Sequence, residues 1–249
     1  MIKNRKGIFR VTGSLFLAIL FAGFAAFTHK SANPKILIFS KTNGYRHASI
    51  PVGIAAIKKL GTENGFDVDA TEDSIAIHYD NLKQYAAVLF LSPTGKVFGP
   101  DEEKGLQEFI QHGGGYVGIH AASDCEYNWA WYGELVGAYF KSHPKQQQAK
   151  ILVVDKNNPA TAHLPETWDR WDEWYNFKNM NPKVTVLLKI DEKSYTGGEN
   201  GDNHPMAWFH DFDGGRAFYT ELGHTDESYA DPNYLKHILG GIKYAIGKK

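Results

Sequence analysis

The stretch that decides the fold is GGGYVGIHAASD, residues 113–124. A glycine turn leads into a short apolar run at 116–119, which ends abruptly at His120. Small residues flank that position, with Gly118 before it and Ala121 and Ala122 after it. A strained strand-to-helix turn requires such neighbours, and α/β hydrolases present their nucleophile at a turn of this kind. The stretch therefore predicts an α/β fold that carries a histidine, instead of serine or cysteine, at its exposed turn.

Apolar runs alternate with helix-like segments through the rest of the first half. The runs at 35–40, 65–72 and 86–92 predict strands, in addition to the one at 116–119. A helix is expected after Ser49, and a second one within 99–115 that stops at the glycines of 113–115. This alternation is typical of a parallel sheet that is covered by helices on both faces.

The second half is less regular. Strands are expected at 149–154 and 183–190, and a hairpin at 206–222 turns around Asp213, Gly214 and Gly215. The segment 165–177 is aromatic and acidic without clear periodicity. A last helix is expected from Asp231, with its apolar face made of Leu235, Ile238, Leu239 and Ile242. The prediction is a three-layer α/β domain, flavodoxin-like or class I glutamine amidotransferase-like, with a mostly parallel sheet and a C-terminal hairpin.

Length and composition agree with one such domain over residues 33–249. The chain has 249 residues, of which 43% are hydrophobic, so it can bury a substantial core. The net charge is -1 with the signs interspersed, which removes the electrostatic basis for binding nucleic acid. The single cysteine, Cys125, cannot form an intramolecular disulfide.

Residues 1–32 have the pattern of an export segment. Basic residues precede the apolar run VTGSLFLAILFAGFAAF at 11–27, which predicts a signal peptide. No clear A-x-A cleavage site follows the apolar run, so an uncleaved N-terminal anchor is the alternative. We therefore expect a periplasmic or extracellular protein that meets a membrane only through this segment, if at all.

Three histidines follow predicted strands, where ligands bind in open parallel sheets. They are His47 after the first strand, His120 after the fourth and His224 after the hairpin. Other histidines are expected to be structural or solvent-facing, namely His78, His112, His163 and His237. The strand-end histidines are therefore the main candidates for chemistry.

Further candidates surround these three. His143 precedes Pro144 in a predicted loop, and Asp172 and Glu173 are the carboxylates expected to face a site. Tyr45 and Arg46, in the loop after the first strand, and Asp124, at the end of the HAASD stretch, are candidates for contacting a substrate. Three aromatic residues could stack on a sugar ring, namely Trp171, Trp174 and Tyr175.

Missing motifs narrow the chemistry. The sequence has no G-x-S-x-G, no P-loop, no H-E-x-x-H and no G-x-G-x-x-G that opens a helix, so no nucleotide cofactor is expected. Imidazole and carboxylate groups remain, and these act as general acids and bases or bind a divalent metal such as zinc. His120, His143 and His224 are the candidate metal ligands, whereas His120, Glu173 and His47 are the candidate catalytic residues.

Five motifs in order resemble the ThuA-like (trehalose utilisation) family over about residues 34–247. They are FSKTNGYRHASI, GGGYVGIHAASD, GAYFKSHP, DEWY and GRAFYTELGHT. The resemblance implies a fold similar to class I glutamine amidotransferases, with His120 at the turn where those enzymes carry a cysteine nucleophile that the ThuA-like family lacks. It also implies a link to trehalose and related disaccharides, often beside oxidoreductases that make 3-keto glycosides.

The hypothesis from the sequence is an exported carbohydrate-processing enzyme, not a glutamine amidotransferase. Its partner would be a disaccharide or keto-sugar derivative, on which it would act as an isomerase, lyase or hydrolase by histidine-centred acid/base or metal-assisted chemistry. The alternative is a non-catalytic carbohydrate-binding or scaffold protein on a degenerate amidotransferase-like fold. Oligomeric state is left open by the sequence.

Overall fold

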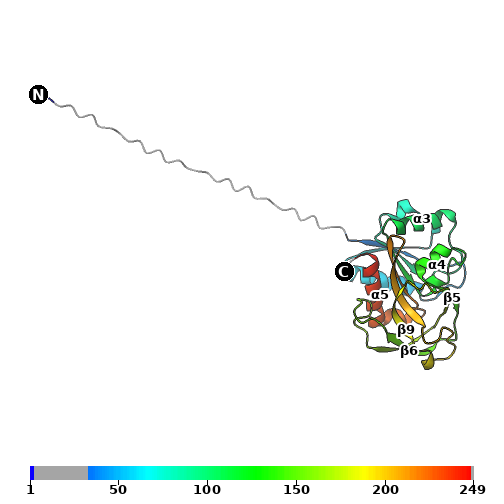
Figure 1. Ribbon diagram of the computed structural model, residues 1–249. Coiled ribbons are helices and arrows are strands. Elements are labelled where there is room, and N and C mark those ends of the chain that lie inside the picture. Colours follow the sequence, from blue (N-terminus) through cyan, green and yellow to red (C-terminus); the bar gives the residue numbers. More distant parts are fainter. Residues whose placement is uncertain (3–32, 248–249) are drawn as a thin grey trace. The chain divides into compact units, whose positions relative to one another are not determined.

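The computed structural model describes residues 1–2 and 33–247 of the chain (Figure 1). The predicted export segment lies outside the described residues, apart from Met1 and Ile2. Within the described part, every helix is too short or too polar to cross a bilayer.

Eleven strands are present in the described residues: β1 (Lys35–Phe39), β2 (Asp67–Thr71), β3 (Ala87–Leu91), β4 (Gly115–Ile119), β5 (Tyr139–Ser142), β6 (Gln147–Val153), β7 (Thr167–Asp172), β8 (Asn176–Lys178), β9 (Thr185–Ile190), β10 (Pro205–Phe212) and β11 (Gly215–Thr220). The α-helices there are α1 (Ile50–Asn64), α2 (Tyr79–Leu82), α3 (Pro100–Gln111), α4 (Ala130–Val136) and α5 (Pro232–Ala245). Short 3₁₀ turns add η1 (Ser74–Ala76), η2 (His120–Ser123), η3 (Glu192–Ser194) and η4 (Asp226–Ala230).

Nine of the strands form one sheet in the order β2-β1-β3-β4-β11-β10-β9-β6-β7. The first five are mutually parallel, and β11 then pairs antiparallel with β10 through the predicted hairpin. The parallel half has the strand order of a flavodoxin-like fold. The remaining strands, β5 and β8, form a separate two-stranded sheet. The predicted fold class is therefore confirmed.

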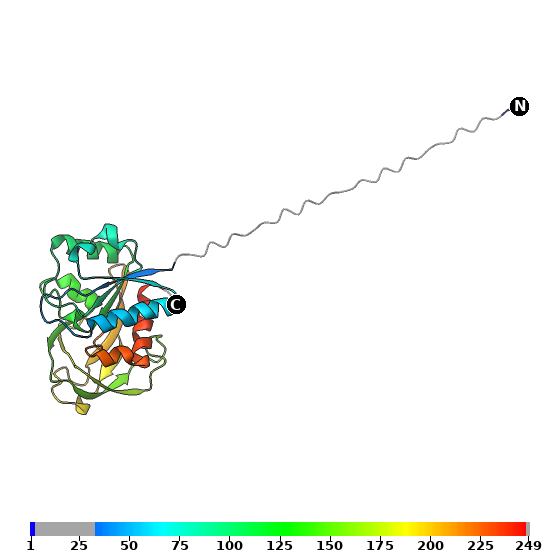
Figure 2. The ribbon, with the colours of Figure 1, turned by 180° about the vertical axis from the view of Figure 1, so that it is seen from behind.

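Helices cover both faces of the parallel half, which completes the three layers. On one face, α1 packs on β2 and β3, and α5 packs on β4 and β11. Figure 2 shows α1 and α5 together on the near side of the sheet. In Figure 1, α5 and α4 lie on opposite sides of the sheet.

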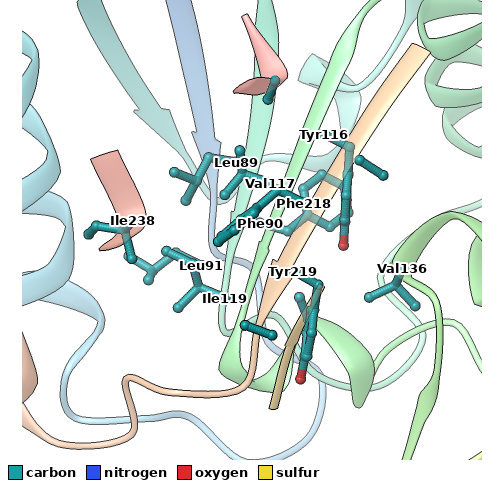
Figure 3. Packing of buried hydrophobic residues seen from close by; sticks show 14 of the residues in the cluster. Leu89, Phe90, Leu91, Tyr116, Val117, Ile119, Val136, Phe218, Tyr219 and Ile238 are labelled. Atoms are coloured by element: carbon teal, nitrogen blue, oxygen red, sulfur yellow. The ribbon is translucent and has the colours of Figure 1, made fainter. Parts of the chain in front are cut away.

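The core lies between the central strands and these helices. Residues of β3 and β4 are buried on both faces, as expected for strands in the middle of a covered parallel sheet. Figure 3 shows Leu91 and Ile119 toward Ile238 of α5, whereas Tyr219 lies on the other side with Val136 of α4. The two side-chain layers thus pack against different helices, while the backbone pairing of the parallel strands sets their register.

Residues 165–177, in which the sequence shows no clear periodicity, contain a regular strand. This segment contains β7, in which Trp168, Arg170 and Asp172 alternate as buried residues with exposed neighbours. The alternation was hidden because two of the three inward-facing side chains are charged. Arg170 and Asp172 form an ion pair with a 3.2 Å N–O distance, which allows both charges to be buried.

The second predicted helix stops at its glycines, as expected: α3 ends at Gln111, and Gly113 takes a positive φ of 90°. On α5, Ile238 and Ile242 are buried as expected, but Leu235 and Leu239 are only partly buried.

His237 of α5 is fully buried, and its titration makes the stability of the domain pH-dependent. Its Nδ1 atom lies 2.8 Å from the carbonyl oxygen of Ala160, and its Nε2 atom lies 3.1 Å from the hydroxyl of Thr220. Burial lowers the pKa of His237 from 6.5 to about 4. The unfolded chain therefore takes up a proton near pH 6.5 that the folded protein takes up only near pH 4. The stability that His237 contributes is present above pH 6.5 and is lost as the pH falls toward 4.

We expect this single site to cost up to about 3 kcal/mol of unfolding free energy between pH 7 and pH 4. Urea unfolding at several pH values checks this, with His237→Gln as the variant and His112→Gln, at an exposed position, as the control. The His237 variant should lose less stability on acidification than the wild type. Equal pH slopes for the three proteins would contradict the assignment.

Candidate metal centre

The turn after β4 holds His120 in a conformation that few non-glycine residues adopt. His120 has a φ of +51°, in the left-handed region. The small neighbours predicted this strained turn, and a Cβ atom at Gly118 would approach the ring of Tyr219 to 2.9 Å. The Nδ1 atom of His120 lies 2.7 Å from the carbonyl oxygen of Glu221, to which it donates. Its Nε2 atom therefore carries a free lone pair.

Four side chains converge at this point, namely His47, His120, Glu173 and His224, whose ligand atoms all lie within 4.8 Å of one another. His47 comes from the loop after β1, and His224 from the loop after β11. Glu173 follows β7. Going across the sheet from β11 through β10, β9 and β6 to β7, each of the four pairings is antiparallel, so β7 runs in the same direction as β11. All four residues therefore reach the same edge of the sheet.

The contacts within the group are short. The Nε2 atom of His120 lies 3.0 Å from Nδ1 of His224 and 3.5 Å from Oε2 of Glu173. The same carboxylate oxygen lies 3.1 Å from Nδ1 of His224. The ring of His47 packs edge-on against both imidazoles, with centroid distances of 4.7 Å to His120 and 5.0 Å to His224.

The electrostatic environment keeps these groups in the forms that bind a cation. Burial, helped by His120 and His224, lowers the pKa of His47 to about 2, so this imidazole is neutral. Burial alone would raise the pKa of Glu173, but hydrogen bonds with His120 and His224 hold it well below its ordinary value. The centre thus combines a neutral imidazole and an ionised carboxylate at neutral pH.

The spacing and the chemistry of the donor set fit a divalent metal. Ligands at about 2.0–2.1 Å from a tetrahedral zinc ion lie roughly 3.3 Å apart, close to the 3.0–3.5 Å separations among His120, Glu173 and His224. The ligand atom of His47 lies within 4.8 Å of these three. The buried Nδ1 atom of His47 has no hydrogen-bond partner, which is costly for a polar atom unless something else binds it. Nitrogen ligands with one carboxylate suit zinc and other transition metals.

Two buried carboxylates, Asp172 and Glu221, hold the backbone of the segments that carry the centre. Asp172 was expected to face the site, but it lies fully buried and accepts from the backbone N–H groups of Gly223 and His224, each at 3.2 Å. Glu221 accepts from the backbone N–H of Tyr175 at 3.1 Å. Burial and the nearby Asp172 raise the pKa of Glu221 well above its usual value. Sequence reasoning missed Glu221, although it lies in the ELGHT stretch that contains His224.

Tyr175 reaches the centre through its hydroxyl and not as part of a stacking surface. Its hydroxyl oxygen lies 3.0 Å from Nε2 of His120, and the two ring centroids are 4.4 Å apart. Burial raises the pKa of this phenol far above its usual value, so it keeps its proton. Trp174 is fully buried and donates to the carbonyl of Gln147, whereas Trp171 is 57% exposed. The structure therefore does not bring the three aromatic residues together as expected.

The other predicted residues lie around the centre or away from it. His143 is 43% exposed and its Nδ1 lies 3.2 Å from Oε1 of Glu173, outside the group of four. The exposed Tyr45 ring packs edge-on against His47, at 4.9 Å between centroids. Arg46 instead forms a surface ion pair with Glu72.

Asp124 and Cys125 follow the His120 turn and have no established role. The Asp124 carboxylate accepts from the hydroxyl of Tyr127 at 2.5 Å, and burial raises its pKa. Cys125 is buried, and burial raises the pKa of its thiol well above the usual value. A thiol in that environment is not an activated nucleophile.

Comparison with known proteins identifies the family. The solved structure of a ThuA-like protein from Bacteroides uniformis is 24% identical, with a TM-score of 0.73 over 90% of this chain and 95% of that one. A ThuA-like protein from Parabacteroides merdae is 21% identical, with a TM-score of 0.73 over 87% and 91% of the two chains.

A β-galactosidase from Bacillus circulans shares the fold at 12% identity, with a TM-score of 0.58 over 88% of this chain and 32% of its own. A search of curated protein sequences gave no match. The sequence profile of the ThuA family, described as trehalose utilisation, matches residues 35–245, and the chain therefore belongs to this family, with a general role in carbohydrate utilisation.

Proposed function

We propose that the protein is an exported, metal-dependent enzyme that acts on a disaccharide or on a keto-sugar derived from one. The single observation that supports this most directly is the convergence of His47, His120, Glu173 and His224 within 4.8 Å at the carboxyl edge of the sheet. Family membership supports the sugar, and the apolar N-terminal segment supports export. The substrate and the reaction are inferred from the chemistry that such a site favours.

Four protein donors constrain how a metal would work here. A tetrahedral ion bound by all four would have no position left for a ligand, so catalysis requires five or more coordination positions or the departure of one donor. When bound, a divalent metal supplies Lewis acidity, which draws electrons from a carbonyl or hydroxyl oxygen of the substrate. A keto-sugar suits this centre, because its carbonyl acidifies the neighbouring C–H bond.

Two side chains next to the four donors are placed to hold and move protons. The neutral Tyr175 hydroxyl, 3.0 Å from His120 Nε2, offers an O–H donor where negative charge would develop on a substrate oxygen. His143 lies at the solvent side, and its Nδ1 atom faces two acceptors, Oε1 of Glu173 at 3.2 Å and the carbonyl of Pro144 at 2.9 Å. Its Nε2 lone pair then faces away from the donors, available to take a proton from the substrate.

A plain carbohydrate-binding role has less support. That alternative depended on a stacking surface of Trp171, Trp174 and Tyr175, and the burial of Trp174 removes its middle member. A binder also gives no reason for a buried group of three imidazoles and a carboxylate.

The test begins with residues 33–249 purified without chelator or histidine tag. Plasma mass spectrometry should find close to one divalent metal per chain, and 3-keto glycosides of trehalose and related disaccharides should be turned over. His143→Gln should retain the metal while turnover falls about a hundredfold, the usual contribution of a general acid or base. Full turnover in metal-free protein would refute the metal-dependent mechanism. Binding of these sugars without turnover, at any metal content, would favour the non-catalytic alternative.

A further inference from the structure

Gln146, in the loop between β5 and β6, contacts the far side of one metal-binding imidazole. Its side-chain nitrogen lies 2.8 Å from Nε2 of His224, whose other ring nitrogen, Nδ1, faces His120 and Glu173. Nothing in the sequence singled out this residue. A role for Gln146 depends on the proposed metal centre, because it concerns which ring nitrogen of His224 carries the proton.

The contacts of His224 can be satisfied by one of its two neutral tautomers. The Gln146 amide nitrogen donates, so Nε2 of His224 accepts and the ring proton is on Nδ1. From there it is donated toward Oε2 of Glu173 at 3.1 Å and Nε2 of His120 at 3.0 Å. His120 can accept because its own proton is on Nδ1, which donates to the Glu221 carbonyl. The hydroxyl of Tyr175 lies at the same 3.0 Å from His120 Nε2 and shares its lone pair.

A metal ion at this centre needs the opposite tautomer of His224. The Nδ1 lone pair must be free to bind the ion, so the neutral ring carries its proton on Nε2. Two N–H donors would then face each other across 2.8 Å, unless the Gln146 amide turns by about 180° and presents its oxygen.

We propose that Gln146 is a positioning residue for His224: its side-chain oxygen accepts from Nε2 when Nδ1 binds a metal, and its side-chain nitrogen donates to Nε2 in the metal-free protein. An amide is suited to this because it offers a donor and an acceptor of nearly equal shape. Gln146 is exposed, so its side chain has room to turn. The neighbouring Gln147 fixes the backbone, since its amide bonds to Lys145 and Thr196.

The test is a series of substitutions with zinc affinity as the readout. Gln146→Leu removes the acceptor and should weaken zinc binding 10–100-fold, the usual effect of losing such a partner. Gln146→Glu offers acceptors only and should bind zinc at least as tightly as the wild type. Competition with a chromophoric chelator measures both. The matched controls are Gln148→Leu and Gln148→Glu, which make the same changes at an exposed position two residues away.

Nitrogen-15 spectra of the histidine rings provide a second readout that a merely structural role would not move. On addition of zinc to the wild type, the proton of His224 should transfer from Nδ1 to Nε2. If the wild type binds no zinc, the proposed metal centre itself is wrong. If the wild type binds zinc but Gln146→Leu binds it equally well, the metal centre stands and the role of Gln146 is refuted. A His224 tautomer that zinc leaves unchanged would also refute that role.

Discussion

Replacing His120 with alanine is expected to weaken zinc binding by several hundredfold. Apparent free energies for zinc sites of four ligands are about 10–16 kcal/mol, so one imidazole accounts for roughly 3–4 kcal/mol. His120 is the most constrained of the donors, because the carbonyl of Glu221 fixes its tautomer and the turn after β4 fixes its direction. Chelator competition measures the affinity, and plasma mass spectrometry measures the metal retained after purification.

A glycine variant separates the lost ligand from the strained backbone. Alanine at a φ of +51° still pays the cost of the left-handed conformation, whereas glycine adopts it freely. His120→Gly should therefore lose zinc as His120→Ala does, but its unfolding free energy in urea should be about 1 kcal/mol higher than that of His120→Ala. His112→Ala, at an exposed histidine, is the control and should bind zinc normally. Wild-type metal content in both His120 variants would show that this imidazole is not a ligand.

The fold and the main histidines could be predicted because both follow from short-range pattern. β3 and β4 are buried on both faces, so their sequences are continuous apolar runs. In a parallel sheet the carboxyl ends of such runs share one edge, which is enough to bring His47, His120 and His224 together.

The segment that carries Glu173 shows where such reasoning failed. In β7, buried positions alternate with exposed ones, but a hydrophobic pattern cannot reveal a strand whose inner face holds Arg170 and Asp172. Density of aromatic residues was interpreted as a stacking surface, although the structure sends Trp171 outward and Trp174 into the core. Glu173 lies within the group of four donors, but the aromatic residues beside it do not form a stacking surface.

Gln146 and Glu221 could not have been found from the sequence alone. Gln146 lies 78 residues from His224, and an uncharged amide in a polar loop carries no pattern that signals a contact. The importance of Glu221 depends on complete burial, which only the packing of the loops after β7 and β11 creates. Hydrophobic periodicity and the positions of strand ends can therefore predict the metal ligands, but they cannot predict contacts between loops.

Asp172→Ala is expected to reduce the unfolding free energy by about 3–5 kcal/mol and to weaken zinc binding at least tenfold. The substitution leaves Arg170 buried without one of its partners, and breaking a buried ion pair from one side costs about this much. Arg170 keeps its second acidic partner, Asp231, at 2.8 Å, so we expect the loss of unfolding free energy to lie closer to about 3 than to 5 kcal/mol. The backbone N–H groups of Gly223 and His224 also lose their acceptor, so the loop that carries His224 is no longer held.

Urea unfolding and chelator competition, carried out on the same preparations, distinguish the two effects. Asp172→Asn keeps an acceptor oxygen but not the charge, so it should lie between alanine and wild type in both measurements and remain folded if alanine does not. Asp169→Ala removes an exposed carboxylate from the same strand and should change neither quantity appreciably. If Asp172→Asn loses stability but binds zinc as tightly as the wild type, Asp172 stabilises the fold without positioning His224. If Asp172→Asn loses zinc affinity as well, the Arg170–Asp172 ion pair of β7 both stabilises the fold and positions the metal centre.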